Sequence, residues 1–201
     1  MMGTVFTKFY DAPPIDLSEI LRYAGVRGEA PELLPMLNEC IDEIMDRLVY
    51  KVCYCELPVS VCGEALDLGF ARILSKDLKK NLSGCHSIVL FAATVGIEPD
   101  RLITRYKAVS ATRALFFQAI GAERIEALCD AFSREIAEQK TKKGRVLCPR
   151  FSPGYGDLPL ELQGDIFKVL DCPRKIGLTL IDSFLMSPSK SVTAIMGVRQ
   201  E

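Results

Sequence analysis

The stretch at residues 150–155, Arg-Phe-Ser-Pro-Gly-Tyr, carries residue types that together could hold a small molecule. The planar guanidinium of Arg150 suits a carboxylate, to which it can donate two parallel hydrogen bonds. Gly154 lets a ligand approach the backbone because it has no Cβ, and Tyr155 offers a flat ring and a hydroxyl. This combination favours a ligand that carries an amino-acid carboxylate and an aromatic base. The same residues are also typical of a structural turn beside a surface arginine, and the pattern alone is too short to decide.

Cysteines form a second group that could do chemistry. Cys53, Cys55 and Cys62 lie close together among the eight cysteines of the chain. Neither a Cys-x-x-Cys pair nor a histidine at ligand spacing accompanies them. In a strand, Cys53 and Cys55 share a face, and we expect them to be small buried thiols. A cysteine-based metal or redox protein is the alternative that they leave open.

Other catalytic constellations have less support. His86 is the only histidine, so a Ser-His-Asp or Cys-His catalytic arrangement would have to include it. It opens a strongly apolar segment, where we expect a structural hydrogen-bonding role. The sequence contains no nucleophile elbow, no P-loop and no Gly-x-Gly-x-x-Gly motif. Hydrolase and nucleotide-phosphate chemistry are therefore not favoured.

Composition excludes several partners. The 201 residues are 49% hydrophobic, and 25 basic residues face 26 acidic ones, which gives a net charge of −1. This balance offers no basic stripe for nucleic acid or for a membrane surface. The longest apolar run, at 88–97, is about half of a spanning helix, and the N-terminal segment lacks the apolar core of a signal peptide. We therefore expect a cytoplasmic protein with free thiols.

The periodicity of apolar residues indicates helices and strands in mixed order. Leu34, Leu37 and Ile41 recur at spacings of three and four, as on one face of a helix. Gly121, inside a long helical pattern, marks either a break between two helices or a place of close backbone approach. Helices are predicted at 16–24, 31–48, 75–82, over the 45 residues that follow 94, and at 160–170. One or two strands are predicted at 50–62, and single strands at 86–94, 145–148, 175–182 and 190–199, the last two joined by a turn at 187–189.

This order does not alternate regularly between strand and helix, so a parallel sheet is not favoured. The sequence predicts the α+β class: a mixed, largely antiparallel sheet flanked by helices, with 86–94 as a central strand buried on both faces. We expect a single domain over 1–201. Residues 1–49 would form a helical N-terminal part, and residues 50–201 would form the sheet and the helices that carry the ligand loop.

Residues 150–171 and 175–198 resemble a known family. The segments RFSPGYGDLPLELQGDIFKVLD and KIGLTLIDSFLMSPSKSVTAIMGV are similar to the C-terminal half of the activation domain of cobalamin-dependent methionine synthase. That family has an Arg-x-x-Pro-Gly-Tyr loop, a helix after it, and a segment like LTxSxxMxPxxSVS. The resemblance covers roughly 86–198, and the Gly-Asp ending of the loop is most like the stand-alone versions of the domain.

The resemblance implies a methionine synthase activation domain-like fold and a role in methionine biosynthesis. The domain would bind S-adenosylmethionine and dock over a corrinoid (cobalamin) held by a partner module. It would support reductive methylation of inactive cob(II)alamin, with an electron from flavodoxin or another reductant. By the family motif, Arg150 would hold the methionine carboxylate, the backbone at Ser152 and Gly154 would contact the ligand, and Tyr155 would shape its pocket. Such a component of a methyltransferase orients a reactive methyl group and needs no nucleophile or general base, so we expect no catalytic residue and no bound metal.

The sequence departs from the family in three places, the first of which is the loop continuation, where PGYGDLPLE replaces the family's usual PGYPACPxH. An acidic ligand contact of the family falls near Asp11 or Asp16, by position only, and a family tyrosine falls at about Met196. These departures leave an alternative, a non-catalytic docking protein for a corrinoid protein that has lost ligand binding. The client could also be another corrinoid methyltransferase.

Overall fold

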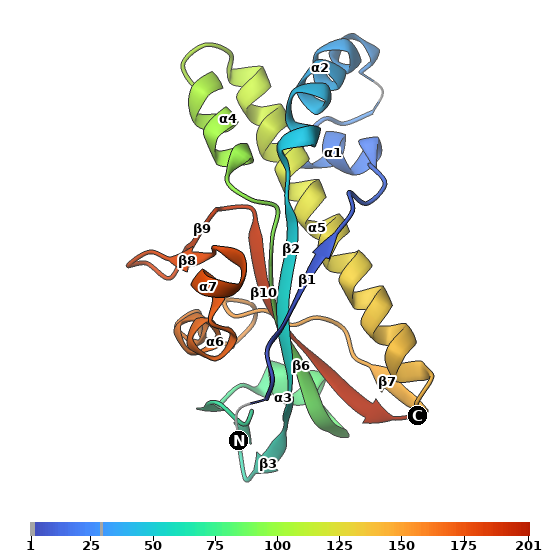
Figure 1. The fold of residues 1–201 in the computed structure, drawn as a ribbon, viewed down its shortest axis with the longest axis vertical. Coiled ribbons are helices and arrows are strands. Elements are labelled where there is room, and N and C mark those ends of the chain that lie inside the picture. Colours follow the sequence, from blue (N-terminus) through green and yellow to red (C-terminus); the bar gives the residue numbers. More distant parts are fainter. Residues whose placement is uncertain (1–2, 29) are drawn as a thin grey trace.

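The computed structural model describes residues 3–28 and 30–201. Its centre is a five-stranded sheet with the order β1-β2-β6-β10-β7, in which every neighbouring pair is antiparallel (Figure 1). The strands of this sheet are β1 (Phe6–Tyr10), β2 (Tyr50–Pro58), β6 (Cys85–Thr94), β7 (Arg145–Leu147) and β10 (Ser191–Gln200). Two small antiparallel ribbons are formed by β3 (Ser60–Cys62), β4 (Ala65–Asp67) and β5 (Arg72–Ile73), and by β8 (Thr179–Leu180) and β9 (Met186–Ser187).

Helices cover both faces of the sheet (Figure 1). The helices are α1 (Leu17–Tyr23), α2 (Leu34–Ile44), α3 (Lys76–Asn81), α4 (Glu98–Tyr106), α5 (Ala111–Thr141), α6 (Leu162–Leu170) and α7 (Cys172–Ile176), with 3₁₀ turns at Pro31–Leu33 and Met45–Arg47. The long helix α5 runs the length of the molecule, with α1, α2 and α4 gathered around its N-terminal half. Helices α6 and α7 lie on the other side of the sheet. The predicted α+β architecture is confirmed.

The central strand β6 divides the interior into two cores. Val89, Phe91 and Ala93 face the core under α5, whereas Ile88 and Leu90 face the core under α6 and α7. Side chains alternate between faces along a strand, so a continuous apolar run at 88–93 can supply both cores at once. The prediction of a central strand that is buried on both faces is confirmed.

Helix α5 continues without a break through Gly121. A Cβ placed on Gly121 would lie 2.9 Å from Cγ of Lys190, so the missing side chain makes room for the lysine stem. The predicted break at Gly121 is therefore wrong, and the close neighbour is the Lys190 side chain where a backbone approach was the other prediction. This contact packs the start of β10 against α5.

A buried ion pair ties the N-terminal segment to the same helix. Arg124 is fully buried and pairs with Glu123, and its Nη1 and Nη2 donate to the carbonyls of Pro13 and Pro14 at 2.6 and 2.7 Å. Asp16 then begins α1 as its N-cap, because its side chain accepts from the amides of the first turn. The chain between β1 and α1 is thus fixed against α5.

The prediction for residues 175–182 is wrong. Residues 172–176 form helix α7, which Gly177 ends at a φ of 72°, and only Thr179–Leu180 is a strand. That strand pairs with β9 and not with β10, which pairs instead with β6 and β7. Ile176 and Leu178 are buried in the core under α6 and α7. A short apolar run of this kind is compatible with either a helix or a strand, so the sequence pattern did not distinguish them.

The N-terminal part also contains a strand that the sequence reading did not predict. β1 pairs along its whole length with β2 and forms one edge of the sheet. Phe6 and Phe9 are exposed, so the segment lacks a buried apolar face. Within the residues that the model describes, no helix is at once long and apolar enough to cross a membrane.

The cysteines occupy separate environments. Cys53 and Cys55 are fully buried on one face of β2, as predicted, and burial raises the pKa of the Cys55 thiol to about 11. Cys62 is exposed on β3, in another sheet. His86 is exposed at the start of β6 and accepts a hydrogen bond at its backbone carbonyl from Val59.

Candidate ligand-binding site

The segment at 148–151 is held beside β10 by backbone hydrogen bonds. The amide of Cys148 donates to Gly197 at 2.8 Å, and Phe151 and Ile195 exchange two hydrogen bonds of 2.9 Å. The segment therefore continues the sheet edge beyond β7. Phe151 packs on the core under α6, and Arg150, its neighbour, points the other way toward α5.

A tight turn follows and sets the position of Tyr155. Gly154 has a φ of 88°, a conformation that residues with a side chain rarely adopt. Its amide donates to the carbonyl of Leu158 at 2.9 Å, and the amide of Tyr155 donates to the carbonyl of Ser152 at 3.2 Å. The turn places the Tyr155 side chain at the surface, where the residue is 70% exposed.

Asp157 fastens the end of this turn to α3. Its carboxylate accepts from the Ser75 hydroxyl and from the amides of Lys76 and Asp77, at 2.6 Å for Lys76. The Ser75 hydroxyl bond and the two amide bonds hold the pKa of Asp157 below its usual value. Ser75 itself is the N-cap of α3. The acid of the Gly-Tyr-Gly-Asp sequence is therefore an anchor for the loop.

The guanidinium of Arg150 is held by carboxylates from two turns of α5. Its Nη2 donates to Asp130 Oδ1 at 2.8 Å and to Glu126 Oε2 at 3.1 Å. The arginine side chain is 26% exposed and Asp130 is 63% exposed, so these contacts are solvent-screened. Cys129 lies nearby, and burial raises the pKa of its thiol to about 12, so it stays protonated at neutral pH.

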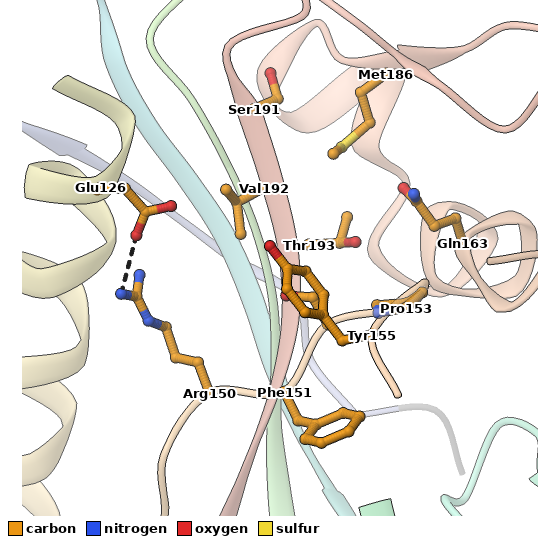
Figure 2. A pocket seen from close by; sticks show the side chains of 11 residues that line it. Glu126, Arg150, Phe151, Pro153, Tyr155, Gln163, Met186, Ser191, Val192 and Thr193 are labelled. Carbon is orange, nitrogen blue, oxygen red and sulfur yellow. Dashed lines mark hydrogen bonds and ion pairs between the residues drawn. The ribbon is translucent and has the colours of Figure 1, made fainter. Parts of the chain in front are cut away.

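A pocket of about 530 Å³ opens between α5, β10 and α6. Glu126 and Arg150 form its charged end, and Gln163 and Met186 form its other end (Figure 2). The volume lies within the range of small-molecule sites, and the lining mixes apolar residues with hydroxyl, amide and charged side chains. The remaining wall residues come from the loop and from β10: Phe151, Ser152, Pro153, Tyr155, Ser191, Val192 and Thr193.

The structure brings three of the four predicted site residues to this pocket. Arg150, Ser152 and Tyr155 line it, and Figure 2 shows the tyrosine ring between the charged end and the Gln163 end. Gly154 forms the turn but does not line the pocket, and its amide already donates a hydrogen bond to the carbonyl of Leu158.

The positions at which the sequence departs from the family lie outside the pocket. Asp11 and Asp16 line a neighbouring hollow, which shares Glu126 with the pocket and lies along α5. Met196 is fully buried under α5, where the Ser133 hydroxyl lies 3.5 Å from its sulfur. A side chain at position 196 therefore belongs to the core.

Sequence reasoning missed Glu126 and Gln163. Glu126 lies on α5, whose sequence pattern indicates only the apolar face of the helix. Gln163 occupies one position of the apolar stripe of α6, whose other buried members are Leu162, Ile166, Phe167 and Leu170. An amide in such a stripe is the signal that could have revealed the second residue, because buried polar groups require partners.

The fold and the pocket define an α+β domain in which an antiparallel sheet and a long helix frame a surface pocket. No protein-family model and no curated protein sequence matches the chain. Among solved structures, it is similar to the "Crystal Structure of the MetH Reactivation Domain bound to AdoHcy". The TM-score is 0.70 at 16% sequence identity, over 96% of this chain and 78% of that one. The chain therefore has the fold of the methionine synthase reactivation domain, as the resemblance predicted.

Proposed function

We propose that this chain binds S-adenosylmethionine in the Arg150 pocket. It would serve as the reactivation module of a corrinoid-dependent methyltransferase such as methionine synthase. The observation that carries the proposal is the pairing of Arg150 with Glu126 at one end of a pocket of suitable size. The similar reactivation domain, whose structure has AdoHcy bound, supports the same ligand class. We place this activity in the cytoplasm.

The charged end of the pocket matches both charges of an amino acid. Arg150 would donate to the α-carboxylate, and Glu126 would accept from the α-ammonium group. Arg150 then exchanges its contact with Asp130 for one with the ligand. That exchange has a small energetic cost, since exposed ion pairs contribute only about 0–1 kcal/mol.

The sulfonium end would lie toward Tyr155, which is 70% exposed and accessible to a partner. The S–CH₃ bond breaks, the sulfur keeps the electron pair as the thioether of S-adenosylhomocysteine, and the methyl group passes to the partner's corrinoid. A flavodoxin or another one-electron reductant supplies the electron that makes the corrinoid nucleophilic. The chain's own contribution is orientation of the donor.

Calorimetric titration with S-adenosylmethionine tests the binding step. Arg150→Ala is expected to weaken binding by about 1.5–3 kcal/mol, the range for a hydrogen bond to a charged group. Arg174→Ala is the matched control, because Arg174 is 85% exposed on α7 and lies outside the pocket wall. Absence of binding to the unaltered protein, with and without a corrinoid partner, would contradict the proposal.

One observation favours a second candidate, a docking protein without ligand binding. The Arg150 guanidinium already has two carboxylate partners within the protein. Labelled S-adenosylmethionine, a corrinoid protein and a reductant together separate the two candidates. Transfer of label to the corrinoid supports the reactivation module, whereas co-purification with the corrinoid protein without transfer supports docking alone.

A further inference from the structure

Gln163 is a polar side chain in an apolar position. It lies in the first turn of α6, is 5% exposed, and shares its buried face with Ile166 and Phe167. Its Oε1 is buried and has no hydrogen-bond partner among the residues that the structure describes. A buried acceptor without a partner is destabilising, so an amide at this position calls for an explanation beyond packing.

The amide lies at the end of the pocket opposite to Arg150. Figure 2 shows Gln163 and Met186 across Tyr155 from the Arg150–Glu126 pair. A ligand whose amino-acid end is held at Arg150 would place its far end between these residues. Met186 and Tyr155 offer a polarizable sulfur and a ring, both suited to the face of an aromatic base.

We propose that Gln163 determines specificity for adenine by binding the edge that carries its 6-amino group. An amide presents an acceptor beside a donor, and adenine presents the 6-amino donor beside a ring-nitrogen acceptor. Glutamine pairs with adenine in this bidentate way in nucleic-acid recognition. The inference rests on the proposed function, since it requires an adenosyl ligand in this pocket. It adds the residue that distinguishes adenine from a 6-oxo purine.

The polar edge is the part of the ligand that best fits this residue. The other predicted contacts, Arg150 and the backbone near Ser152, do not distinguish one purine from another. At the edge formed by the 6-position and N7, which glutamine contacts in nucleic acids, a 6-oxo purine presents two acceptors in place of a donor and an acceptor. The amide nitrogen can then donate to only one of them while the amide oxygen faces the other, so one of the two bonds is lost whichever way the amide is turned.

Calorimetric titration with two ligands tests the assignment. S-adenosylhomocysteine and S-inosylhomocysteine differ at the 6-position, where the amino group is replaced by oxygen. The unaltered protein is expected to bind the adenosyl ligand about tenfold more tightly. Gln163→Leu should reduce this ratio to near one, mainly by weakening the adenosyl ligand. Gln139→Leu, on the exposed face of α5 and outside the pocket wall, should leave the ratio unchanged.

Thermal unfolding of Gln163→Leu distinguishes a ligand role from a structural one. Leucine extends the apolar stripe of α6 and removes an unpartnered carbonyl, so the melting temperature should be equal or higher. If the adenosyl ligand binds and Gln163→Leu keeps the same preference, the specificity role is overturned while the proposed function stands. If neither nucleoside binds the unaltered protein, the proposed function and this inference both fail.

Discussion

Two arginines, one within α5 and one outside it, pair with carboxylates of that helix in different environments. Arg124 is fully buried, and its partners are Glu123 and two backbone carbonyls of the N-terminal segment. Arg150 lies at a pocket, and its partners are two exposed or half-exposed carboxylates. Both guanidinium groups are paired with carboxylates of α5, yet only the second lines a pocket, where the proposed ligand would replace one of its partners. Pairing by itself therefore does not distinguish a structural arginine from a binding one, whereas burial and access to a cavity do.

The largest expected effect is on the buried pair. Arg124→Met leaves Glu123 without its counter-charge in the core and should lower the free energy of unfolding by about 3–5 kcal/mol. Replacing both residues, as in Glu123→Gln with Arg124→Met, should recover a large part of that loss. Chemical denaturation measures both. If Arg124→Met lowers the free energy of unfolding by less than about 1 kcal/mol, Arg124 does not have the structural role assigned to it.

The carboxylates around Arg150 should have opposite effects on ligand affinity. Glu126→Gln removes the charge that would face the ligand ammonium group, and binding of S-adenosylmethionine should weaken about fivefold. Asp130→Asn removes a competing partner of Arg150, and binding should strengthen by up to about fivefold. Calorimetry of the two variants provides the comparison. Tighter binding by both would mean that Glu126 is only a competitor.

Arg150 should contribute little to stability. Its ion pairs are solvent-screened, so Arg150→Ala should change the free energy of unfolding by less than about 1 kcal/mol. Chemical denaturation of Arg150→Ala beside Arg124→Met sharpens the contrast between the two sites. A loss for Arg150→Ala as large as that for Arg124→Met would make Arg150 a structural residue.

The smallest effect is expected at the anchor of the loop. The pKa of Asp157 lies below its usual value, so its ionised form stabilises the fold above about pH 4 and this contribution is lost as the pH falls through the lowered pKa. Asp157→Asn should lower the melting temperature at neutral pH, and the difference should vanish in stronger acid. Thermal scans at several pH values measure this. A difference that does not depend on pH would show that the charge has no role.

The sequence was sufficient for the elements with long and consistent patterns. The continuous apolar run of β6 and the repeat of α5 led to the correct architecture, and Arg150 and Tyr155 were identified as a pair before their surroundings were known. The β1 edge strand was missed because its exposed phenylalanines give no buried face. Residues 175–182 were misread because a short apolar run is compatible with helix and strand alike.

The rest of the pocket depends on contacts between distant segments. Glu126 and Gln163 lie on different helices, and only the fold places them at opposite ends of one cavity. A solvent-facing glutamate on a helix carries no local signal of that role. The amide on the apolar stripe of α6 does carry one, because it contradicts the pattern around it.

A crystal structure of the protein with S-adenosylhomocysteine tests the central claim most directly. We expect the ligand carboxylate within about 3 Å of the Arg150 guanidinium, the ammonium group at Glu126, and the contact between Arg150 and Asp130 broken. A ligand bound elsewhere, or Arg150 still held by Asp130 with the carboxylate in solvent, would contradict the assignment of this pocket.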